Sequence, residues 1–413
     1  MSKLHFSRYF FVFIILSGVF VTSCNTTGQK KKSFQRQYVV ILSMDGFRWD
    51  YAAHASTPNL DQIAKKGVRA AYLNPSFPTK TFPNHYTIAT GLYPDHHGLV
   101  NNSFYAPDLD KYYKISDRDA VEDGRFYGGE PIWVTAEKQG VTSATFYWVG
   151  SEAKIEGIRP TYWKKYASMP YLNRIDTVIS WLQLPLKARP RLIMWYLDEP
   201  DHTGHAFGPT APQTYKKVEY LDSLLGVFLE KLEGLPIADS INFIVTSDHG
   251  MGNISNDRVI DLQSVLKSKW IKIIQGSNPV FTIKAERGYK DSILQKLSNL
   301  NHLRAWKSEN IPSRLHYGTN PRTLDITVVA DSLWSLKWEG DGDFSGGTHG
   351  YDNRDTDMHT IFYAFGPAFK SKYVSPHFNN VDIYDLMAKI LQIKPAKNDG
   401  NFSHVESMLK NKE

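Results

Sequence analysis

The sequence has very little cysteine: Cys24 is the only one in 413 residues. A single cysteine cannot form a disulfide within the chain, so the fold must be stabilised by a packed core rather than by covalent links. Long hydrophobic runs are also missing, because the apolar run at residues 9–21 is shorter than a comfortable membrane span. Internal repeats are absent, and the only low-complexity stretch is the polar segment at residues 25–37. A disulfide framework and a repeat architecture are therefore excluded.

Charge of one sign does not dominate the sequence. The formal net charge is +6, and Lys30, Lys31, Lys32 and Arg36 account for much of it. Because this excess lies in one short stretch, we predict no stable nucleic-acid partner, and the charge is only a weak hint that anionic substrates are tolerated. Hydrophobic residues make up 42% of the chain and charged residues 22%, which excludes a disordered or fibrous protein. The length predicts one large domain, or a domain with a sizeable insertion.

The N-terminus has the pattern of an export signal. Lys3 and Arg8 flank the start of the apolar run, which has the length of a signal-peptide core and ends in the letters VTSC. Small residues followed by Cys24 resemble the lipobox of bacterial lipoproteins, in which the signal is cut before the cysteine and the cysteine carries lipid. A lone cysteine is more usually buried in a core, but Cys24 lies between an apolar leader and a polar stretch.

We therefore predict a signal peptide at residues 1–23, lipidation of Cys24, a polar tether at 24–37 and a folded domain at 38–413. The absence of Asp after Cys24 favours an outer-membrane address, by analogy. The expected location is that of an exported bacterial lipoprotein, facing the periplasm or the cell surface. Its only contact with the membrane would be the N-terminal lipid.

Buried strands alternate with amphipathic helices along the rest of the chain. Continuous apolar, β-branched runs typical of strands buried on both faces lie at residues 38–44, 191–197 and 241–247. Further strands are expected at 141–148 and 360–366, and helices at 57–67, 177–185, 214–234 and 380–393. This alternation predicts an α/β fold with a mainly parallel central sheet and helices on both faces. At about residues 254–344 the pattern changes and predicts a small α/β subdomain inserted in the main domain.

Acidic and imidazole side chains follow directly after the three best strands. The strand at 38–44 leads to Asp45, the strand at 191–197 leads to the letters DEPD and His205, and the strand at 241–247 leads to Asp248 and His249. His349 stands in a glycine-rich loop before another expected strand. A single acidic residue at a strand end is more often a cap or an ion-pair partner. Because ligands bind at the carboxyl ends of parallel strands, these clusters should converge and form a metal site.

The candidate ligands separate into two sets of three. They are Asp45, Asp248 and His249 in the first set, and Asp201, His205 and His349 in the second. Mixed Asp/His sets with an open position are typical of catalytic Zn²⁺, so we predict two Zn²⁺ ions. Two such ions about 4 Å apart can clamp the attacking and leaving oxygens of an in-line phosphoryl displacement.

The stretch PSFPTKTFPNHYTIATG, residues 75–91, contains several hydroxyl groups that could be a nucleophile. Pro83 suits the first turn of a helix and Gly91 can end it, which places Thr81 just before the helix, at the N-cap. The N–H groups at a helix start form an anion site, so Thr81 is the leading candidate. Simple capping is the usual role of a threonine at that position.

Five motifs together carry a family resemblance. They are ILSMDGFRWDY, PTKTFPNHYTIATGLYPDHHGLVNN, EPDHTGHAFGP, TSDHGM and GTHGYDN, in this order. They resemble the motifs of the nucleotide pyrophosphatase/phosphodiesterase family of the alkaline phosphatase superfamily, and they extend from about residue 38 towards the C-terminal helix. The resemblance implies an alkaline phosphatase-like fold and a metal-dependent hydrolase. Its expected substrates are small nucleotides, whose phosphodiester or phosphoanhydride bonds are cleaved to release nucleoside 5′-monophosphates.

The resemblance also implies roles for individual residues. Thr81 matches the nucleophile of the family, which binds the metal of the first set and forms a phosphothreonine-type intermediate that water then hydrolyses with net retention at phosphorus. Asn102 matches the asparagine that holds a non-bridging phosphoryl oxygen, together with the Phe82 backbone N–H. His85 is then not needed as a base, because the metals replace it, and we expect it to orient or pack the helix start.

Aromatic residues suggest where a base would bind. Phe82 follows the nucleophile and could stack on a base, and residues 147–170 resemble the segment that forms the base pocket in nucleotide-hydrolysing members. Tyr166 is the first choice for the opposite stacking face, with Trp148 and Tyr196 behind it. Core packing is the alternative role for Trp148 and Tyr196.

Two alternatives remain open. The first is a phosphodiesterase or phosphomonoesterase for non-nucleotide substrates such as lipid head groups, although the motifs contain no evident arginine for the extra charge of a monoester. The second is a lipoprotein that binds phosphate-bearing ligands without turnover, against which the intact Thr81 and the complete ligand sets argue. A sulfatase of the type that needs cysteine is disfavoured, because Thr81 occupies the nucleophile position.

Overall fold

The computed structural model describes residues 7, 36–340 and 342–411. Three predicted features lie outside the described residues and remain predictions. They are the signal peptide apart from Ser7, the lipidation of Cys24 and the tether up to residue 35. Among the residues that are described, no helix has both the length and the apolar character needed to cross a bilayer.

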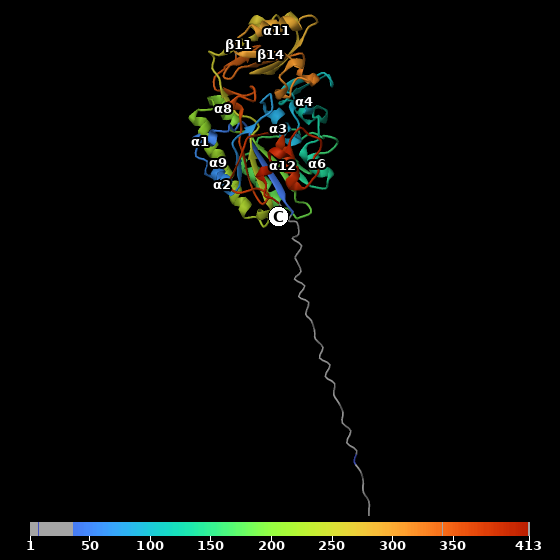
Figure 1. Ribbon diagram of the computed structural model, residues 1–413, viewed down its shortest axis with the longest axis vertical. Coiled ribbons are helices and arrows are strands. Elements are labelled where there is room, and N and C mark those ends of the chain that lie inside the picture. Colours follow the sequence, from blue (N-terminus) through green and yellow to red (C-terminus); the bar gives the residue numbers. More distant parts are fainter. Residues whose placement is uncertain (1–6, 8–35, 341, 412–413) are drawn as a thin grey trace, which may run out of the picture. The chain divides into compact units, whose positions relative to one another are not determined.

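An eight-stranded sheet lies at the centre of the fold (Figure 1). In spatial order its strands are β19 (Tyr373–Ser375), β2 (Val68–Ala70), β18 (Phe362–Phe365), β9 (Ile241–Thr246), β1 (Tyr38–Met44), β8 (Leu192–Leu197), β6 (Ser143–Phe146) and β7 (Tyr162–Lys164). The pairs β9/β1, β1/β8, β8/β6 and β6/β7 are parallel, whereas β18 is antiparallel to both of its neighbours. The mainly parallel sheet expected from the sequence is confirmed.

Helices cover both faces of this sheet. Successive side chains of β1 point to opposite faces, so Val39 and Ile41 pack into one core and Val40 and Leu42 into the other. The first core includes side chains of α3 (Thr81–Thr90), α6 (Ile132–Lys138) and α12 (Asp382–Leu391), and the second those of α2 (Pro58–Lys66), α7 (Tyr171–Gln183) and α9 (Pro212–Glu233). Figure 1 shows α12 and α6 to one side and α2 and α9 to the other.

The expected elements are present with shifted ends. The helix expected at 177–185 begins at Tyr171, directly after Pro170, because the apolar face continues towards the N-terminus through Ile175. The strand expected at 141–148 is limited to Ser143–Phe146. The expected helices at 57–67, 214–234 and 380–393 correspond to α2, α9 and α12.

A second sheet is formed by residues between β9 and β18. Its order is β12 (Ile271–Ser277), β13 (Val280–Ala285), β15 (Ile326–Ala330) and β14 (Leu303–Lys307), antiparallel throughout. The helix α11 (Lys290–Ser298) buries Ile293 and Leu297 in the same core as these strands. Nearby, β11 (Val259–Asp261) pairs with β16 (Ser335–Lys337), and Figure 1 shows β11, β14 and α11 together at one end. The predicted bounds of a subdomain, about 254–344, remain a proposal.

The other α-helices and β-strands of the described residues are short. They are α1 (Tyr51–His54), β3 (Leu73–Asn74), α4 (Pro94–His97), β4 (Ser103–Ala106), β5 (Lys111–Lys114), α5 (Arg118–Glu122), α8 (Asp201–Phe207), β10 (Gly252–Asn253), α10 (Leu262–Val265), β17 (Gly347–Thr348) and β20 (Phe378–Asn379). The pairs β4/β5 and β10/β17 are antiparallel, and β3/β20 is parallel.

Candidate metal centre and substrate pocket

Loops at the carboxyl ends of three central strands carry the acidic candidates. Asp45 follows β1, Asp248 lies just after β9, and Asp201 begins α8 shortly after β8. The Asp201 N–H donates to the Asp45 carbonyl oxygen at 2.9 Å, which fixes one loop against the other. Gly46 has a φ of +67°, and a Cβ at that position would lie 2.9 Å from Asp201 Cα. Glycine at this position therefore permits the close approach of the two loops.

Asp45, Asp248 and His249 meet in a buried cluster, as expected. His249 Nε2 lies 3.3 Å from Asp45 Oδ1 and 3.1 Å from Asp248 Oδ2. The Nδ1 atom of the same ring lies 2.9 Å from the Gly250 carbonyl oxygen, so Nδ1 carries the proton and Nε2 presents a lone pair. Atoms with lone pairs thus face one another at contact distance, an arrangement that a cation between them would stabilise.

Asp201, His205 and His349 form the second cluster. One helical turn separates Asp201 from His205, and His205 Nε2 lies 3.4 Å from Asp201 Oδ1. His349 Nε2, from the loop after β17, lies 3.7 Å from the same oxygen. The Nδ1 atoms of the two rings lie 2.8 Å from the carbonyl oxygens of Gly347 and Thr79. Both Nε2 atoms therefore face Asp201 with free lone pairs, which is the orientation of metal-binding histidines.

Unpartnered oxygens and neutral rings make both clusters suitable for a metal. Asp45 Oδ1, Asp201 Oδ1 and Asp248 Oδ2 are buried and have no hydrogen-bond partner among the described residues. Burial and the neighbouring carboxylates of Asp248 and Asp201 raise the pKa of Asp45 well above its usual range. Burial lowers the pKa of His249 and of His349, which favours the neutral form of both rings. Neutral imidazoles with unpartnered carboxylate oxygens fit Zn²⁺.

Thr81 lies beside the first cluster, with Oγ1 3.1 Å from His249 Nε2. The prediction that Thr81 is the N-cap is wrong: Lys80 is the N-cap, with an extended backbone, and Thr81 is the first residue of α3. The helix therefore starts one residue earlier than predicted, and Pro83 is its third residue. Proline is tolerated there because the N–H groups of the first turn have no partner within the helix. The Thr81 hydroxyl therefore does not cap its own helix and points towards His249.

Asn102 and the Phe82 backbone lie together next to Thr81. The Phe82 N–H donates to Asn102 Oδ1 at 2.9 Å. The backbone N–H of Asn102 donates to Asn101 Oδ1, which orders the loop before β4. The two groups that the family resemblance assigns to one phosphoryl oxygen are thus adjacent, at a helix N-terminus that favours an anion.

His85 does not contact the Thr81 hydroxyl. Its ring is fully buried, with Nε2 2.8 Å from Ser43 Oγ and Nδ1 3.0 Å from the Thr81 carbonyl oxygen. Both ring nitrogens therefore form hydrogen bonds with groups other than the Thr81 hydroxyl. This geometry agrees with the expectation that His85 orients the helix start and is not a base.

A pocket of about 370 Å³ opens beside Thr81. Phe82 and Tyr166, the expected stacking residues, both line it. Tyr166 is 48% exposed, and its ring lies 5.0 Å from the ring of Tyr147. An aromatic surface that is accessible to solvent therefore stands close to the candidate nucleophile.

Trp148 and Tyr196 also line this pocket, but their polar atoms are engaged by the protein. Trp148 is buried, and its Nε1–H donates to the His85 carbonyl oxygen at 3.0 Å. The Tyr196 hydroxyl donates to Asp45 Oδ2 at 2.5 Å. Both residues therefore support the site as well as bounding the pocket.

Part of the pocket wall was not predicted from the sequence. Ile115, Arg118 and Glu152 also line it, and Arg118 forms an ion pair with Glu152. Glu152 lies within the aromatic segment 147–170, which the sequence had already indicated as part of the pocket, so its position there could have been predicted. Ile115 and Arg118 lie just after the β4–β5 hairpin and carry no local signal, because only the tertiary fold brings them to the pocket.

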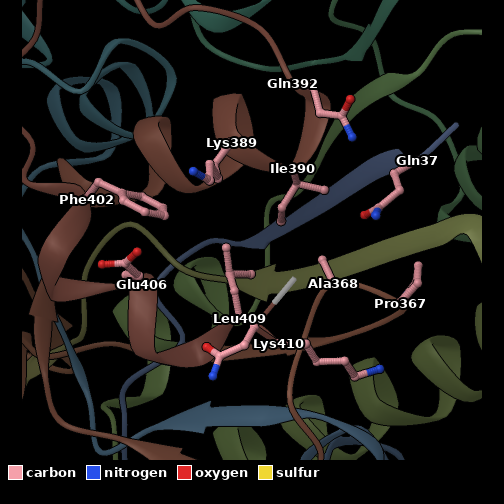
Figure 2. A pocket seen from close by; sticks show the side chains of 11 residues that line it. Gln37, Pro367, Ala368, Lys389, Ile390, Gln392, Phe402, Glu406, Leu409 and Lys410 are labelled. Carbon is pink, nitrogen blue, oxygen red and sulfur yellow. The ribbon is translucent and has the colours of Figure 1, made fainter. Parts of the chain in front are cut away.

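A larger pocket, of about 590 Å³, lies apart from these residues. Figure 2 shows Lys389, Ile390 and Gln392 from the end of α12 around it, together with Gln37 from just before β1. Gln37 and Asp45 flank opposite ends of the seven-residue strand β1, which is about 23 Å long at the usual rise per residue. None of the candidate metal ligands lines this pocket.

Comparison with known proteins identifies the family. A family model described as type I phosphodiesterase / nucleotide pyrophosphatase matches residues 39–352. The chain belongs to this family. The chain is 36% identical over 404 residues to the venom phosphodiesterase CdcPDE of Crotalus durissus collilineatus. It is 35% identical over 396 residues to ectonucleotide pyrophosphatase/phosphodiesterase family member 3 of Rattus norvegicus.

These matches cover 94% and 92% of this chain but 48% and 45% of the two relatives. The chain therefore spans about half the length of the curated relatives it matches. A solved structure of murine ectonucleotide pyrophosphatase/phosphodiesterase 5 gives a TM-score of 0.87 at 35% identity and covers 91% of this chain and 100% of that chain. An inactive threonine-to-alanine variant of that murine protein, in complex with AMP, matches equally well. The alkaline phosphatase-like α/β fold is thus confirmed.

Proposed function

We propose that this family member is a metal-dependent phosphodiesterase and pyrophosphatase that acts on small nucleotides. It would cleave phosphodiester or phosphoanhydride bonds and release nucleoside 5′-monophosphates. The observation that carries the proposal is the position of Thr81, whose Oγ1 lies 3.1 Å from His249 Nε2 at the edge of the first Asp/His cluster. Membership of the family and the AMP complex of the murine relative support it.

Two Zn²⁺ ions are the proposed cofactors. The residues that would hold them are Asp45, Asp248, His249 and Thr81 for one ion, and Asp201, His205 and His349 for the other. When bound, such ions lower the pKa of a coordinated hydroxyl and stabilise the leaving oxygen of an in-line displacement.

Thr81 Oγ1 forms a bond to phosphorus while the bond from phosphorus to the leaving oxygen breaks. The hydroxyl proton passes to solvent water as the hydroxyl ionises, the leaving group departs with the electron pair of the broken bond, and the nucleoside 5′-phosphoryl group is carried on Thr81 as a phosphothreonine-type diester. The Phe82 N–H and the Asn102 carboxamide, which lie together, hold a non-bridging oxygen as its charge develops. Water then displaces Thr81 in a second in-line step, which releases the nucleoside 5′-monophosphate.

The base of the substrate would lie in the 370 Å³ pocket, between Phe82 and Tyr166. Stacking on aromatic side chains contributes roughly 1–3 kcal/mol per base. Tyr166 is half exposed, so its ring surface is accessible to a base. Nucleotide diesters are therefore favoured over diesters that lack a base.

The zinc-loaded protein should hydrolyse p-nitrophenyl thymidine 5′-phosphate with a higher kcat/KM than p-nitrophenyl phosphate or p-nitrophenylphosphocholine. Base stacking alone accounts for a preference of about 5- to 150-fold over the phosphocholine ester. The measurement is the initial rate of nitrophenolate release for each substrate. Faster turnover of the monoester or of the choline ester would contradict a nucleotide substrate.

A pair of tyrosine variants provides the control for that comparison. Tyr166→Ala should remove most of the nucleotide preference by raising KM for the thymidine diester. Tyr112→Ala changes a side chain that is 63% exposed on β5 and does not line the pocket, so this variant should keep the preference. Equal effects of the two changes would contradict a stacking role for Tyr166.

We also propose that the protein is an exported bacterial lipoprotein, anchored to the outer membrane through lipid on Cys24. The support is the charged and apolar leader, the lipobox-like VTSC and the absence of Asp after Cys24. Metabolic labelling with palmitate should label the wild type and not Cys24→Ser. A wild-type protein that takes up no label would contradict the anchor.

A further inference from the structure

His85 is a buried residue at the centre of the site that the proposed chemistry does not use. It lies one helical turn after Thr81 in α3 and has no exposed surface. Its Nδ1 is 3.0 Å from the Thr81 carbonyl oxygen and 3.3 Å from Asp248 Oδ2. Both neighbours are acceptors, so Nδ1 carries the proton; it donates to the Thr81 carbonyl oxygen and lies beside Asp248 Oδ2.

The other side of the ring is fixed by β1 and the pocket wall. Because Nδ1 is protonated, Nε2 accepts the hydroxyl hydrogen of Ser43, whose Oγ lies 2.8 Å away in β1. The ring edges of Trp148 and Tyr196 approach it with centroid distances of 5.4 Å and 5.1 Å, nearly perpendicular in both cases. The imidazole therefore has one orientation, held from three directions.

Asp248 depends on this orientation. Its Oδ1 accepts from the Gly46 N–H at 3.2 Å and from Ser247 Oγ at 3.3 Å. Oδ2 faces the lone pair of His249 Nε2 at 3.1 Å. Among the described residues Oδ2 has no hydrogen-bond partner, and the Nδ1–H of His85 lies 3.3 Å from it, close enough for electrostatic attraction.

We propose that His85 is a positioning residue whose Nδ1–H holds the Asp248 carboxylate in register with Thr81. Through this one group the helix that carries the candidate nucleophile and the loop that carries a candidate metal ligand are kept at a fixed distance. The inference rests on the proposed function, because it takes Asp248 to be a metal ligand. Partners of this kind orient ligands, and their loss typically lowers metal affinity or activity by about 10- to 100-fold.

Two substitutions separate the nitrogens of the ring. The carboxamide nitrogen of asparagine is as many bonds from Cα as Nδ1 of histidine, and that of glutamine is as many bonds from Cα as Nε2. His85→Asn therefore keeps a donor towards Asp248 and the Thr81 carbonyl but gives up the Ser43 contact. His85→Gln keeps a group near Ser43 and removes the donor towards Asp248.

The test is zinc retention by the full-length protein in competition with a chelator, with near-UV circular dichroism as the check on folding. His85→Gln should release one of its two zinc ions at about 10- to 100-fold lower chelator concentration than the wild type. His85→Asn should release both ions close to the wild-type concentrations. In kinetics with p-nitrophenyl thymidine 5′-phosphate, His85→Gln should lower kcat with little change in KM, because the pocket residues are untouched.

Either of two results would overturn the inference. One is a His85→Gln protein that holds both zinc ions as tightly as the wild type; the other is an equal loss in His85→Gln and His85→Asn, which would indicate packing alone. If His85→Gln does not fold, His85→Ala takes its place beside His85→Asn, because it also removes the donor; zinc affinity of His85→Ala equal to that of His85→Asn would refute the role. A wild-type protein that binds no zinc is a failure of the proposed function itself, and it is seen before any variant is measured.

Discussion

Replacement of Thr81 by alanine should lower kcat for p-nitrophenyl thymidine 5′-phosphate by more than about 10³-fold, because removal of a covalent nucleophile can cost as much as about 10⁶-fold in kcat. The physical reason is that the Thr81 hydroxyl, 3.1 Å from His249 Nε2, is the group placed to form the bond to phosphorus. The alanine variant keeps the six other candidate ligands and the pocket walls. The measurement is single-turnover and steady-state hydrolysis of the chromogenic diester by metal-loaded protein.

Thr81→Ser is the matched control, because it keeps the hydroxyl and removes only the methyl group. It should retain far more activity than Thr81→Ala, with KM nearly unchanged. Zinc content measured in parallel should stay at two ions per chain in the serine variant. An alanine variant that turns over the diester at the wild-type rate would refute Thr81 as the nucleophile.

Removal of metal should abolish turnover and also destabilise the folded protein. Without a cation, His249 Nε2 stays 3.1 Å and 3.3 Å from two carboxylate oxygens, and buried oxygens of Asp45, Asp201 and Asp248 stay unpartnered. At a zinc concentration 1,000 times the dissociation constant, each occupied site adds about 4 kcal/mol to stability by mass action. Thermal unfolding and diester hydrolysis, each measured before and after chelation, should both show a large loss that added Zn²⁺ reverses.

The His249→Ala variant is the control for the chelation experiment. It removes one ligand of the first set while the three residues of the second set remain, so chelation should lower its Tm by less than it lowers that of the wild type. Full activity and an unchanged Tm after exhaustive chelation of the wild type would contradict a metal-dependent site.

The grouping of the candidate ligands was predictable because strand ends are local features. The apolar runs before Asp45 and Asp248 are long enough to identify buried parallel strands, and the carboxyl ends of such strands meet at one edge. Asp201 and His205 are four residues apart on one helix, so their proximity also follows from spacing.

Other features were not predictable because they depend on distant packing. The start of α3 was misplaced by one residue, since nothing in the sequence distinguishes Pro83 in the second helical position from Pro83 in the third. Arg118 reaches the pocket only through the fold of the segment after β5. The contact of His85 with Ser43 joins residues that are 42 positions apart, and no spacing rule connects a helix to a strand at that separation.

The stereochemical course at phosphorus tests the central claim, a covalent intermediate at Thr81, most directly. The measurement uses p-nitrophenyl thymidine 5′-phosphorothioate of known configuration, hydrolysed in ¹⁸O-labelled water, with the configuration of the labelled thymidine 5′-phosphorothioate determined afterwards. Two successive in-line displacements, first by Thr81 and then by water, predict net retention. Net inversion would show that water attacks phosphorus directly and would contradict the proposed intermediate.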